Sequence, residues 1–131
     1  MNTTSAHSIE SIIRDYIEHR EQSLLYGKKR MDAEKEYNKL LAKYGGENRH
    51  YSLDHANDIY KAYIDMITFG EASRQADALF IETEEKLKEI GRILFEPTIS
   101  ADITISSPGQ APRLSSVTVI YNNGQVMVNQ A

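Results

Sequence analysis

The chain has 131 residues, enough for one domain with a modest core and too few for two domains of ordinary size. Its 15 Lys and Arg against 19 Asp and Glu give a net charge of −4. Such a chain lacks the positive field of proteins that coat nucleic acid or anionic membranes, so we expect neither as a partner. The absence of cysteine excludes disulfides and thiol catalysis, and it fits a cytoplasmic protein.

The charges are confined to one part of the chain. Residues 1–97 carry 14 of the basic and 18 of the acidic residues, whereas residues 98–131 contain only Asp102 and Arg113. No apolar run approaches the roughly 18 residues of a membrane-spanning helix. The first residues also lack the basic-then-apolar order of a secretory signal. We therefore divide the chain at Pro97 into a charged segment and a nearly neutral one within the same domain.

The pattern of residues 8–44 predicts a long helix. Ser8 is placed to cap its N-terminus, because the hydroxyl accepts a bond from a free amide of the first turn. Gly45 and Gly46 mark its end, since glycine adopts left-handed backbone conformations without strain. Apolar residues recur with a heptad period, interrupted by polar residues in the middle. Positions a and d are Ile9, Ile12, Tyr16, His19, Ser23, Tyr26, Arg30, Ala33, Tyr37, Leu40 and Tyr44.

Residues 52–95 predict a second long helix, with Ser52 as its N-cap. Its end is set at about Phe95, because Pro97 disfavours helical geometry in the residue before it. Positions a and d are Ile59, Ala62, Met66, Phe69, Ser73, Ala76, Phe80, Thr83, Leu87, Ile90 and Leu94.

The seven residues 45–51 are a usual length for joining antiparallel helices, so we expect a coiled-coil-like helical hairpin. Folding the chain at this loop brings Tyr16 to Phe80 and Tyr37 to Ile59. Two helices alone leave much apolar surface in water. This surface must be covered by the C-terminal segment, by a second copy, or by both. A two-fold homodimer forming a four-helix bundle is the simplest solution.

After Pro97 the apolar period becomes two, which indicates β-strands. Residues 98–106 and 114–121 alternate apolar with polar side chains. Asn123-Gly124 predicts a type I′ hairpin turn, because both residues need positive φ. The prediction is an α+β fold in which the helical hairpin precedes an antiparallel sheet of two or three strands.

A sheet this small needs support from the helices or from a second chain. The tail offers few charges of its own to protect the strand edges. Two interpretations stay open. Either the sheet is covered within the protomer or its dimer, or one edge accepts a partner strand by β-augmentation.

No motif of catalysis or cofactor binding is present, so we expect no enzyme and no cofactor. Glu47 and His50 have a spacing found in di-iron bundles, but the motif occurs once. Two Asp/His pairs at helical spacing, Asp15 with His19 and His50 with Asp54, lack a third ligand. We therefore expect no metal site.

Polar residues interrupt both heptad seams at one level of the predicted hairpin. Polar seam residues usually determine register and oligomeric state, and a small binding pocket is the alternative. The candidate residues are His19, Ser23, Tyr26, Ser73 and Asp77.

The pattern as a whole favours a non-enzymatic assembly or protein-interaction protein, homodimeric through its long helices, with the C-terminal sheet as a lid or docking edge. The alternative is a partner-neutralising protein, such as an immunity protein or a specialised chaperone. In that case the acidic helical surface masks a basic partner.

Overall fold

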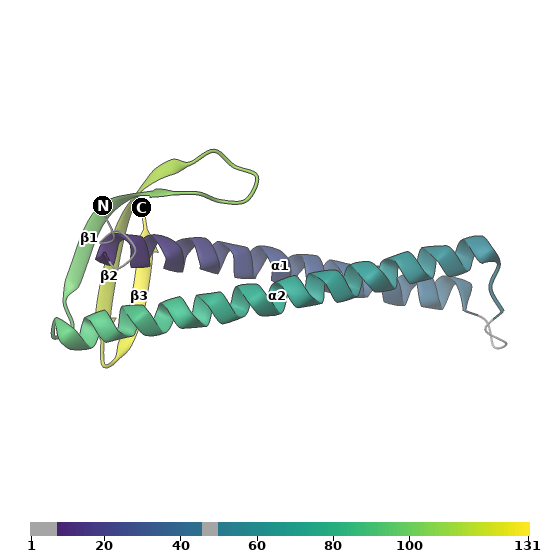
Figure 1. The fold of residues 1–131 in the computed structure, drawn as a ribbon, viewed down its shortest axis with the longest axis horizontal. Helices are drawn as coiled ribbons and strands as arrows, with labels where there is room; N and C mark the ends of the chain where they lie inside the picture. The colour runs from purple at the N-terminus through teal and green to yellow at the C-terminus, as the bar shows by residue number, and fades with distance from the viewer. Residues whose placement is uncertain (1–7, 46–49) are drawn as a thin grey trace, which may run out of the picture. The chain divides into compact units, whose positions relative to one another are not determined.

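The computed structural model describes residues 8–45 and 50–131. Two helices, α1 (Ile9–Tyr44) and α2 (Leu53–Ile93), precede the strands β1 (Thr98–Ile105), β2 (Arg113–Asn122) and β3 (Gln125–Gln130) (Figure 1). The strands form one antiparallel sheet in the order β1-β2-β3. The predicted α+β fold, a helical hairpin followed by a small sheet, is confirmed. Within the described ranges, neither helix combines the length and apolar character that crossing a membrane requires.

Both predicted helix caps are present. The Ser8 hydroxyl accepts a hydrogen bond from the Ser11 amide at 3.1 Å, and the Ser52 hydroxyl accepts one from the His55 amide at 3.2 Å. These bonds satisfy amides that have no partner inside the first helical turn. The helix α1 continues through Gly27 without a break.

The predicted end of the second helix was two residues too late, because α2 ends at Ile93. Phe95 and Glu96 follow with φ of 58° and 53°, in the left-handed region. The Glu96 amide donates to the Gly91 carbonyl at 2.7 Å, as in a Schellman C-cap. The chain therefore turns away from the helix before Pro97, at two non-glycine residues for which this conformation is strained.

The chain divides into two compact units, and each helix contributes to both. The first unit contains residues 8–22 and 76–131, and the second contains residues 23–75. The first unit thus combines the beginning of α1, the end of α2 and the whole sheet. The second unit consists of helical segments and the described part of their connection.

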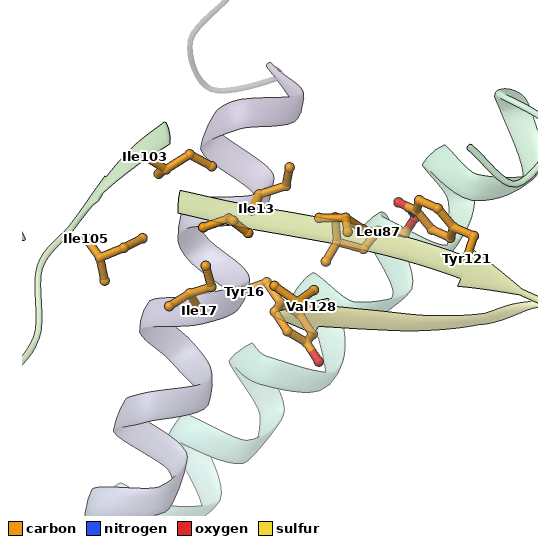
Figure 2. Close-up of a cluster of buried hydrophobic side chains, with 10 residues drawn as sticks. Ile13, Tyr16, Ile17, Leu87, Ile103, Ile105, Tyr121 and Val128 are labelled. Carbon is orange, nitrogen blue, oxygen red and sulfur yellow. Dashed lines mark hydrogen bonds between the residues drawn. The ribbon is translucent and has the colours of Figure 1, made fainter. Parts of the chain in front are cut away.

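The core of the first unit lies between the helices and one face of the sheet (Figure 2). The apolar residues of the strands alternate toward this face, as the period of two predicted. One face of the sheet is therefore covered by helices of its own chain. The alternative that an edge accepts a partner strand concerns the strand edges and stays a prediction. The buried cluster consists of Ile13, Tyr16, Ile17, Leu87, Ile103, Ile105, Val117, Val119, Tyr121 and Val128.

The hairpin between β2 and β3 has the predicted turn. Asn123 and Gly124 have φ of 53° and 75°, as a type I′ turn requires. The register pairs Tyr121 with Val126 and Val119 with Val128. Tyr121 therefore lies on the core face.

The predicted pairing of the helices is confirmed at the level of Tyr16 and Phe80. In the first unit, the rings of Tyr16 and Phe80 lie 5.1 Å apart between centroids. In the second unit, Tyr37 contacts Tyr63 at 5.7 Å, whereas Ile59 was predicted. Ile59 and Tyr63 are about one helical turn apart, so this contact lies near the predicted level and does not test the pairing of Tyr37 with Ile59.

Candidate interaction surfaces

The five polar seam residues divide between the two units. In the first unit, His19 Nδ1 lies 2.9 Å from the Thr83 hydroxyl oxygen. The Thr83 hydroxyl donates its hydrogen to the Leu79 carbonyl at 2.9 Å. His19 Nδ1 therefore carries the proton and donates to Thr83. This bond links α1 to α2, while Asp77 is exposed.

The second unit holds the other three seam residues. Ser73 is buried, and Ser23 and Tyr26 are half-buried. The Lys29 ammonium lies 5.6 Å from the centroids of both the Tyr26 and the Phe69 ring. Lys29 thus makes cation–π contacts within the helical hairpin. The role of the polar seam in determining register stays a prediction, and so does its alternative, a small binding pocket.

The candidate metal ligands do not come together in the part of the chain that the structure describes. Residues 8–45 and 50–131 contain no group of three His, Asp or Glu side chains that could hold an ion. Glu47 lies outside the described residues. The imidazole of His55 stacks on the Tyr44 ring, with centroids 3.8 Å apart. His55 therefore contributes to packing near the ends of the two helices.

An apolar stripe on α2 faces away from α1 in the second unit. Tyr60 and Ile64 each lie two residues from Ala62, which is buried in the helical hairpin. Two residues correspond to about 200° around a helix, so both side chains point to the opposite side. The stripe consists of Leu53, Tyr60, Ile64 and Ile67, whose exposed fractions are 76%, 66%, 41% and 51%.

An acidic groove lies between α1 and α2 in the second unit. It comprises two adjoining hollows of about 290 Å³ each, with Glu36, Ala62 and Asp65 lining both. Asp32 and Asp58 add two further carboxylates to its walls. Among the described residues, the ammonium groups that line the two hollows are those of Lys29 and Lys61, so carboxylates exceed cations in these walls.

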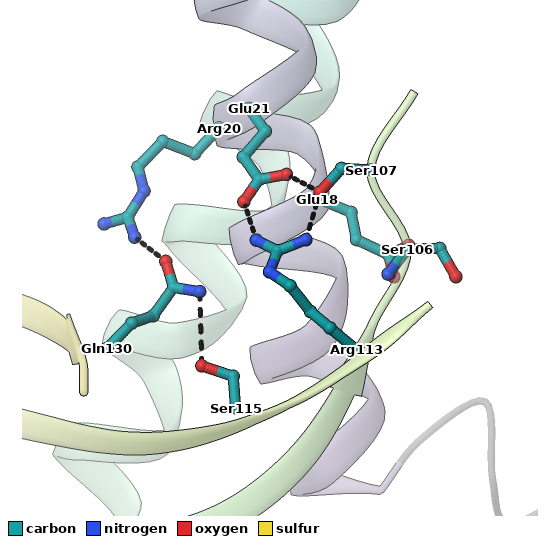
Figure 3. Close-up of polar contacts among 8 residues, drawn as sticks. All are labelled: Glu18, Arg20, Glu21, Ser106, Ser107, Arg113, Ser115 and Gln130. Atoms are coloured by element: carbon teal, nitrogen blue, oxygen red, sulfur yellow. Dashed lines mark hydrogen bonds and ion pairs between the residues drawn. The ribbon is translucent and has the colours of Figure 1, made fainter. Parts of the chain in front are cut away.

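Charged side chains of α1 cover parts of both sheet edges (Figure 3). At β1, Arg14 donates to the Thr104 carbonyl at 3.0 Å. Directly after the strand, the Glu18 carboxylate accepts from the Ser106 amide at 2.8 Å. On β3, Arg20 donates to the Val128 carbonyl at 3.3 Å. From the sequence, residues 98–131 contain too few charges to protect the strand edges themselves. The protection comes instead from a helix about 90 to 110 residues earlier in the chain.

A second polar cluster attaches the start of β2 to α1. The Arg113 guanidinium donates to the Glu21 carboxylate at 2.6 Å, and the Ser107 hydroxyl contacts both groups (Figure 3). Arg113 is the only Lys or Arg after Pro97 in the sequence. This was the one sequence feature that could have indicated its role in attaching the sheet to α1. Its position opposite Glu21 could not be read from spacing, because the two residues belong to elements far apart in the chain.

The end of α2 and the β2–β3 turn enclose a smaller pocket in the first unit. Its volume is about 270 Å³. The Glu96 carboxylate accepts hydrogen bonds from the amides of Asn123 and Gly124 at 3.2 and 3.3 Å. The adjacent Phe95 side chain is 91% exposed. The left-handed backbone at these residues thus directs Glu96 to the turn and leaves Phe95 in solvent.

Tyr121 closes one side of this pocket. Its hydroxyl donates to the Leu87 carbonyl at 2.7 Å, and burial raises the pKa of this phenol above its ordinary value. Gly91 lies directly beneath the ring, where an added Cβ would overlap it. The glycine therefore permits the close approach of α2 to the sheet.

Comparison with known proteins identifies no relative. No family model, curated protein or solved structure matches the chain.

Proposed function

We propose that this chain is a non-enzymatic assembly protein that forms a homodimer through its long helices. The observation that supports the proposal best is the exposed stripe of Leu53, Tyr60, Ile64 and Ile67 on α2. A helix that is apolar on two opposite sides is normally covered on both. In the second unit, α1 covers one of these sides.

The stripe has the character of an interface core. Between Leu53 and Ile67, the residues at helical spacing along its centre are uncharged, and Tyr60 combines a large apolar ring with a hydroxyl. Interface cores are depleted in charge and enriched in such aromatic residues. The nearby acids Asp58 and Asp65 line the groove on the other side of the helix.

A second copy is the simplest occupant of this stripe. An isologous contact needs a surface that complements itself, and an uncharged apolar row meets this condition without opposing like charges. Two helical hairpins joined in this way make a four-helix arrangement, in which the α2 stripes bury each other. The long helices are then the assembly element, and the sheet caps the end of the hairpin that it covers.

The test is the oligomeric state of a charged variant. Ile64→Glu places a carboxylate in the middle of the stripe, where burial in a dimer would be costly. We expect the unaltered chain to be dimeric at micromolar concentration by light scattering. The variant should be at least about tenfold weaker in dimerisation, since burying an unpaired charge costs more than about 1.4 kcal/mol.

Asn38→Glu is the matched control, because it adds the same charge at an exposed position of α1 in the same unit. This variant should dimerise like the unaltered chain. Circular dichroism should show the same helix content for all three proteins. A folded unaltered chain that stays monomeric at 100 micromolar would contradict the proposal.

The acidic groove supports a second candidate function, the neutralisation of a basic protein partner. Glu36 and Asp65 line both hollows of the groove, and Asp32 and Asp58 extend it. A negative groove attracts a basic partner and increases the association rate at low salt. The carboxylates of the groove are exposed, so a basic partner surface could reach them.

An oligolysine peptide is a suitable probe of this second candidate. Binding should weaken with added salt, as expected for an interaction between charged surfaces. The double variant Glu36→Gln and Asp65→Asn should bind at least about tenfold less tightly, whereas Glu82→Gln, outside the groove, should bind normally. Equal binding by both variants would exclude the groove as the site.

A further inference from the structure

The outer edge of β1 is covered along only part of its length. In an antiparallel sheet, alternate residues direct both backbone groups to the same neighbour. The Ala131 amide donates to the Ser116 carbonyl. The backbone amides and carbonyls of the even-numbered residues of β2 therefore point toward β3. Ser116 is opposite Asp102 in the register of β1 and β2. Since the backbone groups of Ser116 are directed to β3, those of Asp102 and of the other even-numbered residues of β1 point away from β2. The contacts of the Thr104 carbonyl with Arg14 and the Ser106 amide with Glu18 agree with this direction.

The uncovered part of this edge is Thr98, Ser100 and Asp102. All three residues are exposed. In the described chain, side chains of α1 reach the edge at Thr104 and Ser106, and none contacts the backbone at Ser100 or Asp102. A row of free amides and carbonyls is a template for another strand. The edge is therefore open at the beginning of β1 and closed at its end.

We propose that this open edge pairs with the same edge of a second copy, antiparallel and with Ser100 opposite Ser100. This register places Thr98 of each copy opposite Asp102 of the other. Three residues of each copy then exchange both backbone hydrogen bonds with their partners. The two sheets join into one continuous sheet of six strands. The pairing ends where Arg14 and Glu18 already occupy the edge.

The charges in this register favour a second copy over an unrelated strand. Asp102 is the only charged residue in β1. In the proposed register it faces the Thr98 hydroxyl, which can donate to it, and not the other Asp102. The two carboxylates are four residues apart along the strands, roughly 13 Å, which exceeds the screening length of about 8 Å at physiological salt. The edge therefore complements itself without opposing like charges.

This pairing is distinct from the helical dimer and extends the proposed function. The α2 stripe belongs to the second unit, and the β1 edge belongs to the first. A chain with two self-complementary surfaces links copies alternately through each of them. Assemblies larger than a dimer should then form as concentration rises. Each contact can be removed separately, so the two proposals can fail independently.

A single introduced cysteine tests the register. The chain has no cysteine, so any disulfide in Ser100→Cys joins two copies. Directly opposed residues have Cα atoms about 5.5 Å apart, within the range that a disulfide bridges. Under mild oxidation at ten micromolar, Ser100→Cys should form a covalent dimer at least about tenfold faster than Asn129→Cys. Asn129 is exposed on β3 and serves as the matched control.

Backbone variants test the contact without cross-linking. Ser100→Pro removes the outward amide, and proline is tolerated at such edge positions. Ser100→Lys keeps the amide and opposes two ammonium groups, so it tests the same contact if the proline disturbs the fold. Both should limit assembly to dimers in light scattering, whereas Ser100→Ala should behave like the unaltered chain.

The combined variants separate the two interfaces. Ser100→Cys should still cross-link when Ile64→Glu has removed the helical contact. Equal oxidation rates for Ser100→Cys and Asn129→Cys would overturn the β1 pairing and leave the helical dimer unaffected. Unchanged assembly of both Ser100→Pro and Ser100→Lys would also overturn the β1 pairing between two copies. This is the result expected if the edge instead accepts a strand of another protein.

Discussion

The same two helices have different surroundings in the two units. In the first unit the sheet forms a second layer over them, and Leu87 is completely buried. The three described strands all belong to the first unit, and in the second unit Leu24 is 71% exposed. Both leucines belong to long amphipathic helices. The comparison shows that an apolar pattern identifies a face that needs cover, whereas burial depends on a layer that supplies it.

The largest difference between the units should appear when a leucine is truncated in each. Leu87→Ala leaves a cavity between the helices and the sheet, and should lower the free energy of unfolding by about 2 to 5 kcal/mol. Leu24→Ala should change it by less than about 0.5 kcal/mol. Urea unfolding at a concentration where the chain is monomeric measures both. Equal effects would show that the first unit has no separate core.

Two glycines of α2 give the next comparison. Gly91→Ala would force the Tyr121 ring away from the helix, and should destabilise the fold by about 1 to 3 kcal/mol. No atom lies within 4 Å of a Cβ added at Gly70. Gly70→Ala should therefore stabilise the protein by about 0.5 to 1 kcal/mol, because alanine favours the helix. Thermal unfolding measures the opposite signs, and a stabilising Gly91→Ala would contradict the close packing at Tyr121.

Two ion pairs provide a smaller contrast. Arg113 and Glu21 join the sheet to α1 at 2.6 Å, and both side chains are partly buried. A double-mutant cycle with Arg113→Gln and Glu21→Gln should give a coupling energy of about 1 kcal/mol. The exposed pair of Arg74 and Glu71 in the second unit should give less than about 0.5 kcal/mol. Equal coupling would mean that the sheet does not depend on this contact.

The smallest expected effect concerns pH. Burial raises the pKa of Tyr121 in the folded chain, so folding favours its protonated form. Its contribution to stability is complete below the unfolded pKa of about 10 and is lost as pH rises through the folded value. Tyr121→Phe should cost about 1 kcal/mol at pH 7 and should reduce the loss of stability above pH 10.

Tyr60→Phe, measured at a concentration where the chain is monomeric, is the control, because Tyr60 is exposed in the single chain. If Tyr121→Phe shows the same alkaline dependence as Tyr60→Phe, the Tyr121 phenol does not contribute to it.

Local features were predictable from the sequence because their physical causes are local. Ser8 and Ser52 cap the helices through amides three residues away, and Asn123-Gly124 supplies the turn of the hairpin. The end of α2 was predicted less well. Pro97 disfavours helical geometry in the residue before it, which limits how far α2 can continue. It does not predict that Phe95 and Glu96 adopt left-handed backbone conformations.

The candidate polar residues show the same limit. His19 was selected because it interrupts a heptad, and its bond to Thr83 depends on the register of the two helices. The roles of Arg14 and Glu18 at the β1 edge were not predicted. Nothing in the sequence near these residues indicates a strand about ninety positions away.

The sequence by itself determined the type and order of the elements, the face of each strand that is apolar, and the confinement of charge to the helical part. These properties follow from periodicity, caps and turns, which act over a few residues. The tertiary structure alone decided which apolar faces are covered and where the strand edges are closed. These depend on contacts between distant segments. As a result, a nearly uncharged tail has its edges protected by the charges of α1, and the part of β1 that these charges do not reach is the surface proposed for self-assembly.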